Sequence, residues 1–169
     1  MVENHYNDLE FWYPYYRLKE EGAEVVSVGP KGGEIYTGKA GIVARADKGM
    51  LDVSVKEFDA LVIPGGYAPD HMRRYPGMVD LVRQFNLQGK VVAAICHAGW
   101  MLASADIISG RKVTAFFSIK DDLEHAGATF VDREVVVDEN LITSRQPDDL
   151  PAFMRAVIQG IERQGRAIA

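Results

Sequence analysis

The clearest indication of the fold is the segment Val91-Val92-Ala93-Ala94-Ile95-Cys96-His97-Ala98-Gly99. Its first five residues are wholly apolar, which is typical of a strand covered on both faces, and such strands belong to parallel sheets. The cysteine follows at once, and residues 98–105 can form a helix. We therefore expect a buried strand, a sharp turn and a helix, which is the repeating unit of an α/β domain.

The segments on either side continue this alternation. We expect further strands at 23–28, 60–63, 135–137 and 141–144, and further helices at 9–21, 77–88, 119–126 and 148–161, the last one capped by Asp148. The two late strands flank a short turn and predict a hairpin. Residues 31–47 hold several glycines around short apolar stretches and predict a small β-hairpin excursion. The expected fold class is α/β, with a mostly parallel sheet and helices on both faces.

The start of the chain differs from this scheme. Such a domain usually opens with a buried strand, but here the first helix is expected from Leu9, and only Met1 and Val2 could belong to a preceding strand. Either the domain lacks part of a central strand, or this chain starts later than its natural parent. We expect a single domain over residues 1–169 with a truncated first strand, because this length suits one core.

Composition excludes several classes of protein. A net charge of -5 argues against a general nucleic-acid binder, and no apolar run reaches the roughly 18 residues of a membrane span. The N-terminus has no secretory pattern. One cysteine excludes an internal disulfide and a Cys-rich zinc site, and fits a reducing cytoplasm. No His, Asp and Glu cluster has metal-binding spacing, so we expect neither a metal nor a cofactor.

The lone cysteine, Cys96, has two interpretations. Ala94 and Ala98 stand two positions on either side of it, which is the small-x-nucleophile-x-small pattern of a nucleophile elbow. An elbow places the thiol at a helix N-terminus, where free N–H groups favour the thiolate, so we expect a thiol pKa below the free value of about 8.5. The alternative is that Cys96 is simply a small buried apolar residue.

A cysteine nucleophile also needs donors for an oxyanion. The backbone N–H of the residue after the nucleophile, His97, supplies one in elbows, and a loop after a neighbouring strand supplies the other. Gly65 and Gly66 follow the expected strand 60–63, and glycine allows a close approach of the backbone to a substrate. The alternative for Pro64-Gly65-Gly66 is an ordinary turn.

Four segments together resemble the PfpI family of intracellular proteases. They are residues 58–66 (FDALVIPGG), 94–97 (AICH), 119–122 (IKDD) and 143–150 (TSRQPDDL). This family is a branch of the class I glutamine-amidotransferase-like superfamily, which also contains the parkinsonism-associated deglycase. The resemblance implies a flavodoxin-like three-layer sandwich and a homodimer or higher homo-oligomer. It also implies peptide hydrolysis, removal of methylglyoxal or glyoxal adducts from proteins, or glutathione-independent glyoxalase chemistry.

The resemblance further implies roles for individual residues. Cys96 and His97 form the catalytic pair, Asp70 is an acidic partner delivered from a neighbouring subunit, and Glu10 lies beside the sulfur. Four positions depart from the family pattern. Asp70 replaces a glutamate, Asn7 replaces an acidic residue and Phe116 replaces a tyrosine, while Ala98-Gly99-Trp100 replaces a Gly-Pro start of the elbow helix.

These observations lead to one main expectation of function. We expect a cytoplasmic cysteine hydrolase in which Cys96 attacks a carbonyl carbon, His97 polarises the thiolate and Asp70 orients His97. A protonated Glu10 would donate a hydrogen bond to the sulfur, and the backbone amides of Gly66 and His97 would hold the oxyanion. The substrate would be a peptide, a glycated protein or a small dicarbonyl, with no nucleic acid or membrane involved. The alternatives are a stress-response redox sensor or holding chaperone that uses the same cysteine, and an interaction module with a vestigial site.

Overall fold

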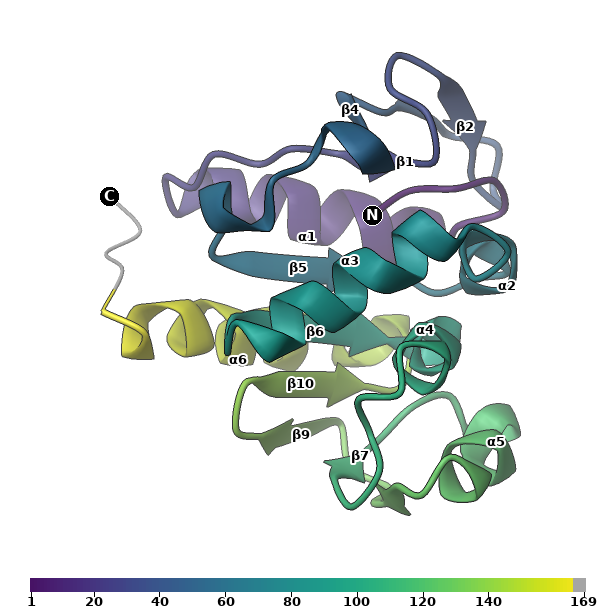
Figure 1. Ribbon diagram of the computed structural model, residues 1–169, viewed down its shortest axis with the longest axis vertical. Coiled ribbons are helices and arrows are strands. Elements are labelled where there is room, and N and C mark those ends of the chain that lie inside the picture. The colour runs from purple at the N-terminus through teal and green to yellow at the C-terminus, as the bar shows by residue number, and fades with distance from the viewer. Residues whose placement is uncertain (166–169) are drawn as a thin grey trace.

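Helices and strands alternate along the chain in a computed structural model that describes residues 1–165 (Figure 1). The last four residues of the expected 1–169 domain lie outside the described residues. The helices are α1 (Asp8–Glu20), α2 (Ala68–Met72), α3 (Pro76–Leu87), α4 (Gly99–Ser104), α5 (Lys120–His125) and α6 (Leu150–Arg163). The strands are β1 (Val28–Gly29), β2 (Ile35–Thr37), β3 (Val43–Arg45), β4 (Lys48–Gly49), β5 (Ala60–Ile63), β6 (Val91–Ile95), β7 (Lys112–Val113), β8 (Thr129–Phe130), β9 (Val135–Asp138) and β10 (Leu141–Ser144).

The central sheet has four strands in the order β5-β6-β10-β9. β6 lies parallel to both neighbours, with Val92 opposite Leu61 on one side and Leu141 on the other. β9 runs antiparallel to β10, as expected for the late hairpin. The mostly parallel sheet predicted from the sequence is therefore confirmed, and so is the hairpin excursion, because β2 and β3 pair antiparallel.

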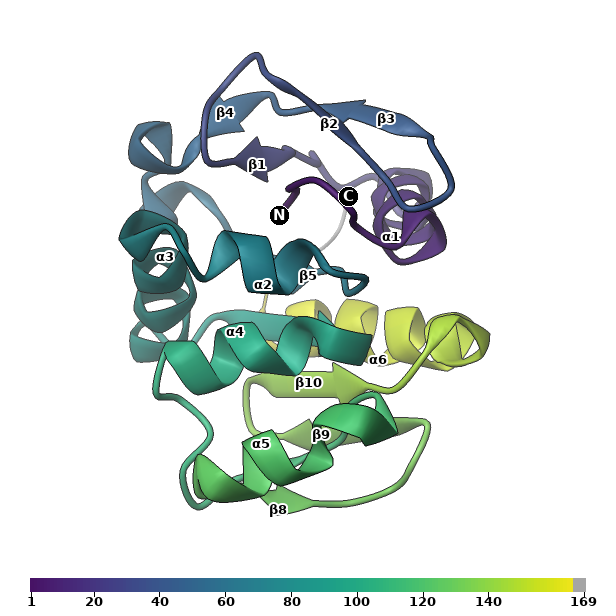
Figure 2. The same cartoon turned by 90° about the vertical axis from the view of Figure 1, so that its right-hand side faces the viewer.

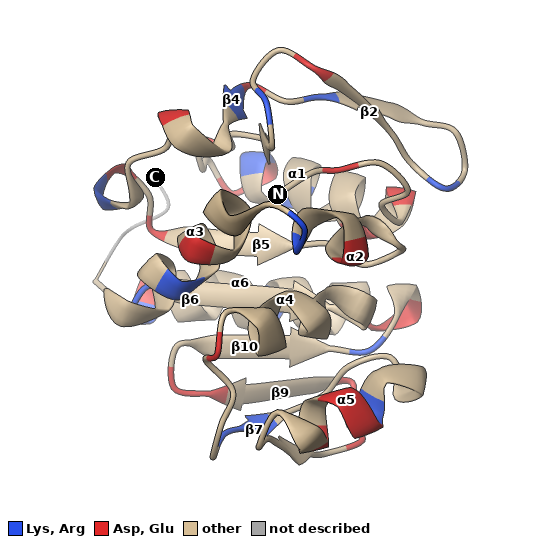
Figure 3. Ribbon diagram, turned by 45° about the vertical axis from the view of Figure 1, so that its right-hand side comes forward, with Lys and Arg blue, Asp and Glu red and all other residues tan. Residues whose placement is uncertain are grey.

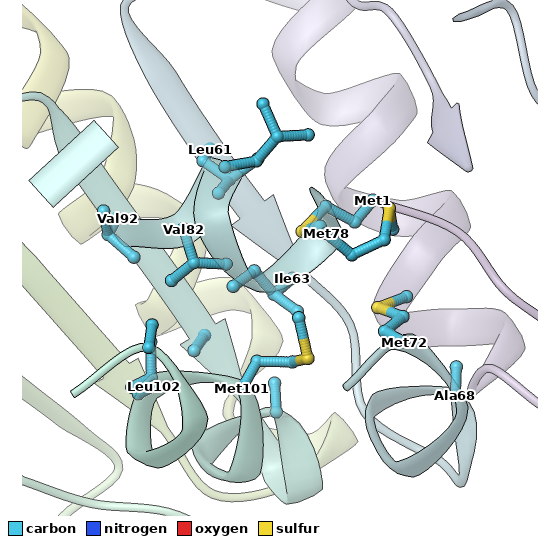
Figure 4. Packing of buried hydrophobic residues seen from close by; sticks show 14 of the residues in the cluster. Met1, Leu61, Ile63, Ala68, Met72, Met78, Val82, Val92, Met101 and Leu102 are labelled. Carbon is cyan, nitrogen blue, oxygen red and sulfur yellow. The ribbon is translucent and has the colours of Figure 1, made fainter. Parts of the chain in front are cut away.

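Helices cover both faces of this sheet (Figure 2). α1 and α6 pack together on one face, while α3 and α4 pack against β6 on the other. Along β6 the side chains alternate between the two cores, with Ala93 and Ile95 in the α6 core and Val92 and Ala94 in the α3 and α4 core. Figure 4 shows the second core, where Met78, Val82 and Met101 surround Ile63 and Val92. This explains why the stretch 91–95 has no polar position.

The expected strand at 23–28 is wrong over most of its length. Only Val28 and Gly29 form a strand, β1, which pairs with β4 in a separate two-stranded sheet. Among residues 1–165, Met1 bonds to Val62 and Val2 to Val28, and no described strand pairs with residues 23–27. β-propensity alone does not make a strand, since the hydrogen bonds come from a partner.

The ends of other elements also differ from expectation. α6 begins at Leu150 after a single turn of 3₁₀ helix, and Asp148 is not its cap. The neighbouring Asp149 forms an ion pair with Arg145 at 2.9 Å instead of capping the helix. The sequence did not predict α2, β7 or β8, which are too short for a periodic pattern to show.

Charged residues are interspersed along the elements. Figure 3 shows acidic positions on α2 and α5 with basic positions close by, in keeping with a modest net charge of -5. Within residues 1–165, no helix has the length and apolar character that crossing a membrane requires.

Candidate active site

Cys96 lies directly after β6, at the turn into α4. Its backbone has φ of 62°, in the left-handed region that non-glycine residues seldom adopt. Residues Cys96–Ala98 form a 3₁₀ turn before α4 begins at Gly99. Such strain persists only where the surrounding structure enforces it, and it is the geometry expected of a nucleophile elbow. The side chain is buried, with only 6% of the residue exposed.

The loop after β5 closes over the sulfur. A Cβ added at Gly65 would stand 2.6 Å from the Cβ of Cys96, so the loop approaches too closely for any larger residue. Gly66 has φ of 75°, and its backbone N–H and that of His97 both donate to the Cys96 sulfur. The two amides named from the sequence as oxyanion donors thus converge on one atom. Pro64-Gly65-Gly66 is therefore more than a turn, because it forms one wall of the site.

Glu10 reaches the site from the first turn of α1. Asn7 caps this helix, and its side chain accepts from the N–H groups of Leu9 and Glu10. The Glu10 side chain is fully buried, and its Oε2 accepts from the Gly65 N–H at 2.8 Å. Its Oε1 has no hydrogen-bond partner of normal geometry within the described chain. An orphaned buried carboxylate oxygen is costly, and a proton on the carboxyl removes that cost.

The raised pKa of Glu10 also favours a proton on its carboxyl group. Burial raises the pKa of Glu10 to about 7, against the opposing effects of the Gly65 N–H, the Cys96 thiol and the charge of Lys39. Near neutral pH a large share of the molecules therefore carry a neutral carboxyl group here. In that form it can donate a hydrogen bond to the sulfur.

The expected low pKa of the Cys96 thiol is wrong for the free chain. Burial, and next the negative charge of Glu10, raise the pKa of the Cys96 thiol, and the N–H groups of Gly66 and His97 only partly oppose them. The short α4 and two amides do not outweigh the loss of water around the sulfur. Since part of the increase comes from Glu10, the proton on that carboxyl controls how readily the thiolate forms.

His97 sits beside the thiol as a neutral ring. Its Nδ1 lies 3.2 Å from the Cys96 sulfur, and its Nε2 lies 3.3 Å from the Ser118 hydroxyl. Burial, and next the charge of Lys39, lower the pKa of His97, so the imidazole is available as a proton acceptor. Phe116 stacks on the ring with centroids 5.0 Å apart. The sequence did not single out Ser118, which lies 21 residues away and gives no local signal.

Asp70 is not brought to His97 within the chain. It lies on α2 with 42% of its side chain exposed, and it forms an ion pair with Arg74. Among residues 1–165 the Nε2 of His97 meets Ser118 instead. The chain thus brings together Cys96, His97, Glu10 and the Gly65–Gly66 loop, while Asp70 remains on α2, partly exposed and paired with Arg74.

The fold and the site are those of an α/β protein with a sharp strand-to-helix turn, and Cys96 stands at this turn. The chain belongs to the DJ-1/PfpI family, whose model matches residues 1–160. It is 46% identical to "Deglycase PfpI" of Pyrococcus furiosus over 92% of this chain and 93% of that protein. It is 43% identical to "Protein/nucleic acid deglycase 2" of Escherichia coli over 94% of each.

A solved structure supports the fold independently. A two-domain protein of Anabaena variabilis, with a DJ-1/ThiJ/PfpI-like and a ferritin-like domain, superposes with a TM-score of 0.93 at 44% identity. The match covers 97% of this chain and 48% of that protein, so this chain spans about half of it. The flavodoxin-like sandwich implied by the sequence resemblance is therefore confirmed.

Replacing Glu10 by glutamine should make Cys96 more reactive at neutral pH. The Glu10→Gln variant loses the negative charge that raises the thiol pKa, so the midpoint of alkylation rate against pH should fall below that of the wild type. Because the chain has one cysteine, iodoacetamide labelling reports on Cys96 alone. Glu20→Gln, an exposed charge loss on the same helix, should leave the midpoint unchanged. A wild-type midpoint equal to or below that of Glu10→Gln would contradict the coupling.

Proposed function

We propose that the protein is a cysteine-dependent hydrolase that removes dicarbonyl adducts from amines, and that Cys96 is its nucleophile. The observation that carries this proposal is the convergence on one sulfur of a strained elbow, two backbone donors and the Glu10 carboxyl. Structural cysteines need none of these. The deglycase names of relatives at 46% and 43% identity support the same class of reaction.

The first chemical step follows from the contacts. With Glu10 neutral, the thiol passes its proton to Nδ1 of His97, 3.2 Å away, and the sulfur attacks the substrate's carbonyl carbon. A sulfur–carbon bond forms and the carbonyl π pair moves to oxygen. The N–H groups of Gly66 and His97, which already lie at the sulfur, then donate to that oxyanion.

The second step releases the amine. The proton held by His97 goes to the leaving nitrogen, so the amine departs neutral. In peptide hydrolysis a water molecule then cleaves the thioester and restores the thiol. In deglycation the adduct's carbinol carbon exchanges the amine for the Cys96 sulfur, which frees the amine and leaves a hemithioacetal. Transfer of the C–H proton of that carbon to the neighbouring carbonyl carbon, through an enediol, turns the hemithioacetal into the thioester of a hydroxy acid without an external oxidant. One water molecule then cleaves this thioester, releases the hydroxy acid and restores the thiol. Both reactions use the same residues, and neither needs a cofactor.

Product analysis on two substrates tests this function. A lysine peptide modified with methylglyoxal should return the unmodified peptide, with release of the hydroxy acid, as measured by mass spectrometry. An unmodified fluorogenic peptide, run in parallel, measures peptidase activity of the same preparation. Return of the unmodified lysine peptide at the rate of spontaneous decay alone would refute the deglycase proposal.

We propose further that Asp70 completes the site of a second copy of the chain. Asp70 lies on α2, shortly after the site's glycines, and its side chain is 42% exposed, so after exchanging its ion pair with Arg74 it could approach the His97 of a neighbouring copy. Asp70→Ala and Cys96→Ser chains should each be inactive alone. After unfolding and joint refolding, mixed oligomers should recover activity, because one pairing joins an intact Cys96 with an intact Asp70. No recovery, with oligomers verified by native mass spectrometry, would rule out a shared site.

A further inference from the structure

The tip of the β2–β3 hairpin is anchored beside the candidate active site. The buried carboxylate of Asp8 accepts from the Ala40 N–H at 2.7 Å and from the Ile42 N–H at 3.0 Å. A Cβ added at Gly38 would collide with the same carboxyl group, so the tip lies directly against α1 (Figure 2). Since Asp8 stands two residues before Glu10, the hairpin is fixed to the part of α1 that enters the site.

Lys39 stands at this tip, and its side chain lies against the site. Its backbone N–H donates to the Tyr6 carbonyl at 2.8 Å, and its Nζ lies 5.4 Å from the centre of the Tyr67 ring. The centre of the Tyr67 ring is in turn 6.4 Å from that of the His97 ring. One aromatic ring thus links the ammonium group to the histidine beside the thiol.

No carboxylate of the described chain neutralises Lys39. The lysine ion pairs among residues 1–165 are formed by Lys48 and Lys120. The charge of Lys39 nevertheless acts on both groups that flank the sulfur. Burial raises the pKa of Glu10 and lowers that of His97, and the positive charge of Lys39 lowers both. A positive charge in this position attracts an anionic group of a substrate toward the reacting atoms.

We propose that Lys39 and the ring of Tyr67 form an anion subsite, and that the preferred substrates are amine adducts of 2-oxoaldehydes that carry a carboxylate. A lone ammonium group matches a single negative charge, whereas phosphate sites gather several donors. The exposed ring of Tyr67 offers an apolar surface to a short aliphatic spacer between the reacting carbon and the carboxylate. This inference rests on the proposed function, because it assigns the substrate class of the same site.

Two alkylating reagents of nearly the same shape test the subsite without catalysis. Iodoacetate carries a carboxylate where iodoacetamide carries a neutral amide, and both label Cys96, the one cysteine of the chain. At pH 9 the ratio of their rate constants, iodoacetate over iodoacetamide, should fall at least about threefold in Lys39→Gln. The thiolate fraction cancels in this ratio. Lys39→Arg keeps the charge and should retain most of the wild-type ratio, whereas about 0.5 M NaCl should lower the wild-type ratio.

The indirect effects of losing Lys39 act against this result. Without its charge the pKa values of Glu10 and His97 rise, so the carboxyl is more often neutral and the imidazole more often charged. Both changes favour iodoacetate, so a lower ratio reports direct attraction between Lys39 and the anion. The matched control is Lys19→Gln. The Nζ of Lys19 also lies over a tyrosine, 5.2 Å from the centre of the Tyr15 ring, but in the last turn of α1, and its loss should leave the ratio unchanged.

Substrate preference provides the second arm. A lysine peptide modified with 4,5-dioxopentanoate, a 2-oxoaldehyde that ends in a carboxylate, should be restored with release of 2-hydroxyglutarate. Its kcat/KM should exceed that of the same peptide modified with the methyl ester of this reagent. The preference should fall at least about threefold in Lys39→Gln and persist in Lys19→Gln.

Three results would each overturn the anion subsite. They are an alkylation ratio that Lys39→Gln leaves unchanged, an equal fall of that ratio in Lys19→Gln, and equal kcat/KM of the two modified peptides in the wild type. Restoration of neither peptide would refute the proposed function and the substrate class. The alkylation ratio needs only a reactive thiol, so it decides separately whether Lys39 attracts an anion to the site.

Discussion

Gly66→Ala should unfold at much lower denaturant concentration than the wild type and lose most of its activity. A Cβ at this position would collide with the His5 carbonyl oxygen and stand 2.6 Å from the Asn7 nitrogen. The loop at residues 5–7 is held against residues 65–67 by backbone hydrogen bonds, such as Asn7 N–H to the Gly65 carbonyl at 3.1 Å. Pushing these loops apart displaces the cap of α1, and with it Glu10, from the sulfur.

The matched control for this change is Gly110→Ala. Gly110 has φ of 76°, almost the same as 75° at Gly66, but an added Cβ there meets no atom within 4 Å. It therefore carries only the conformational strain, about 1–2 kcal/mol. Gly66→Ala carries the strain and the collision, so we expect a loss of about 3 kcal/mol or more in the free energy of unfolding. Similar losses in the two variants would mean that loop packing at Gly66 contributes little.

Parts of the fold could be predicted because their signal is local. The apolar run 91–95 indicated a strand buried on both faces, and alternate residues of β6 do enter two different cores. The helix expected at 9–21 is present as α1, and Gly22, directly after its C-cap Glu21, has φ of 87°. The segment 23–28 has the same apolar character as other strands but no neighbour for most of its length. Whether this segment forms a strand depends on a partner strand from elsewhere in the chain, and a local sequence pattern carries no information about such a partner.

Some features of the candidate site have a local sequence signal, whereas others depend on how distant segments pack together. The elbow at Cys96 and the glycines after β5 carry recognisable spacings, and the structure places them in contact. The raised thiol pKa could not be derived from the sequence, because it follows from burial that only the packed molecule creates. Ser118 likewise depends on how the chain after β7 returns to His97. The roles of Asp70 and the redox alternative stay predictions.

In the proposed mechanism Cys96 forms the covalent bond to the substrate. Cys96→Ser should lower turnover of the methylglyoxal-modified peptide by at least about 10³-fold, since a hydroxyl is a far weaker nucleophile than a thiolate at neutral pH. The change is nearly isosteric, so circular dichroism and Tm should match the wild type closely.

The most direct measurement is intact and peptide-level mass spectrometry of the wild type, quenched with acid during turnover of that substrate. We expect a substrate-derived mass on the peptide that contains Cys96, formed at least as fast as product, and no such mass in Cys96→Ser. Product formation at the wild-type rate by well-folded Cys96→Ser, or a substrate-derived mass on another residue with Cys96 unmodified, would contradict the proposed mechanism.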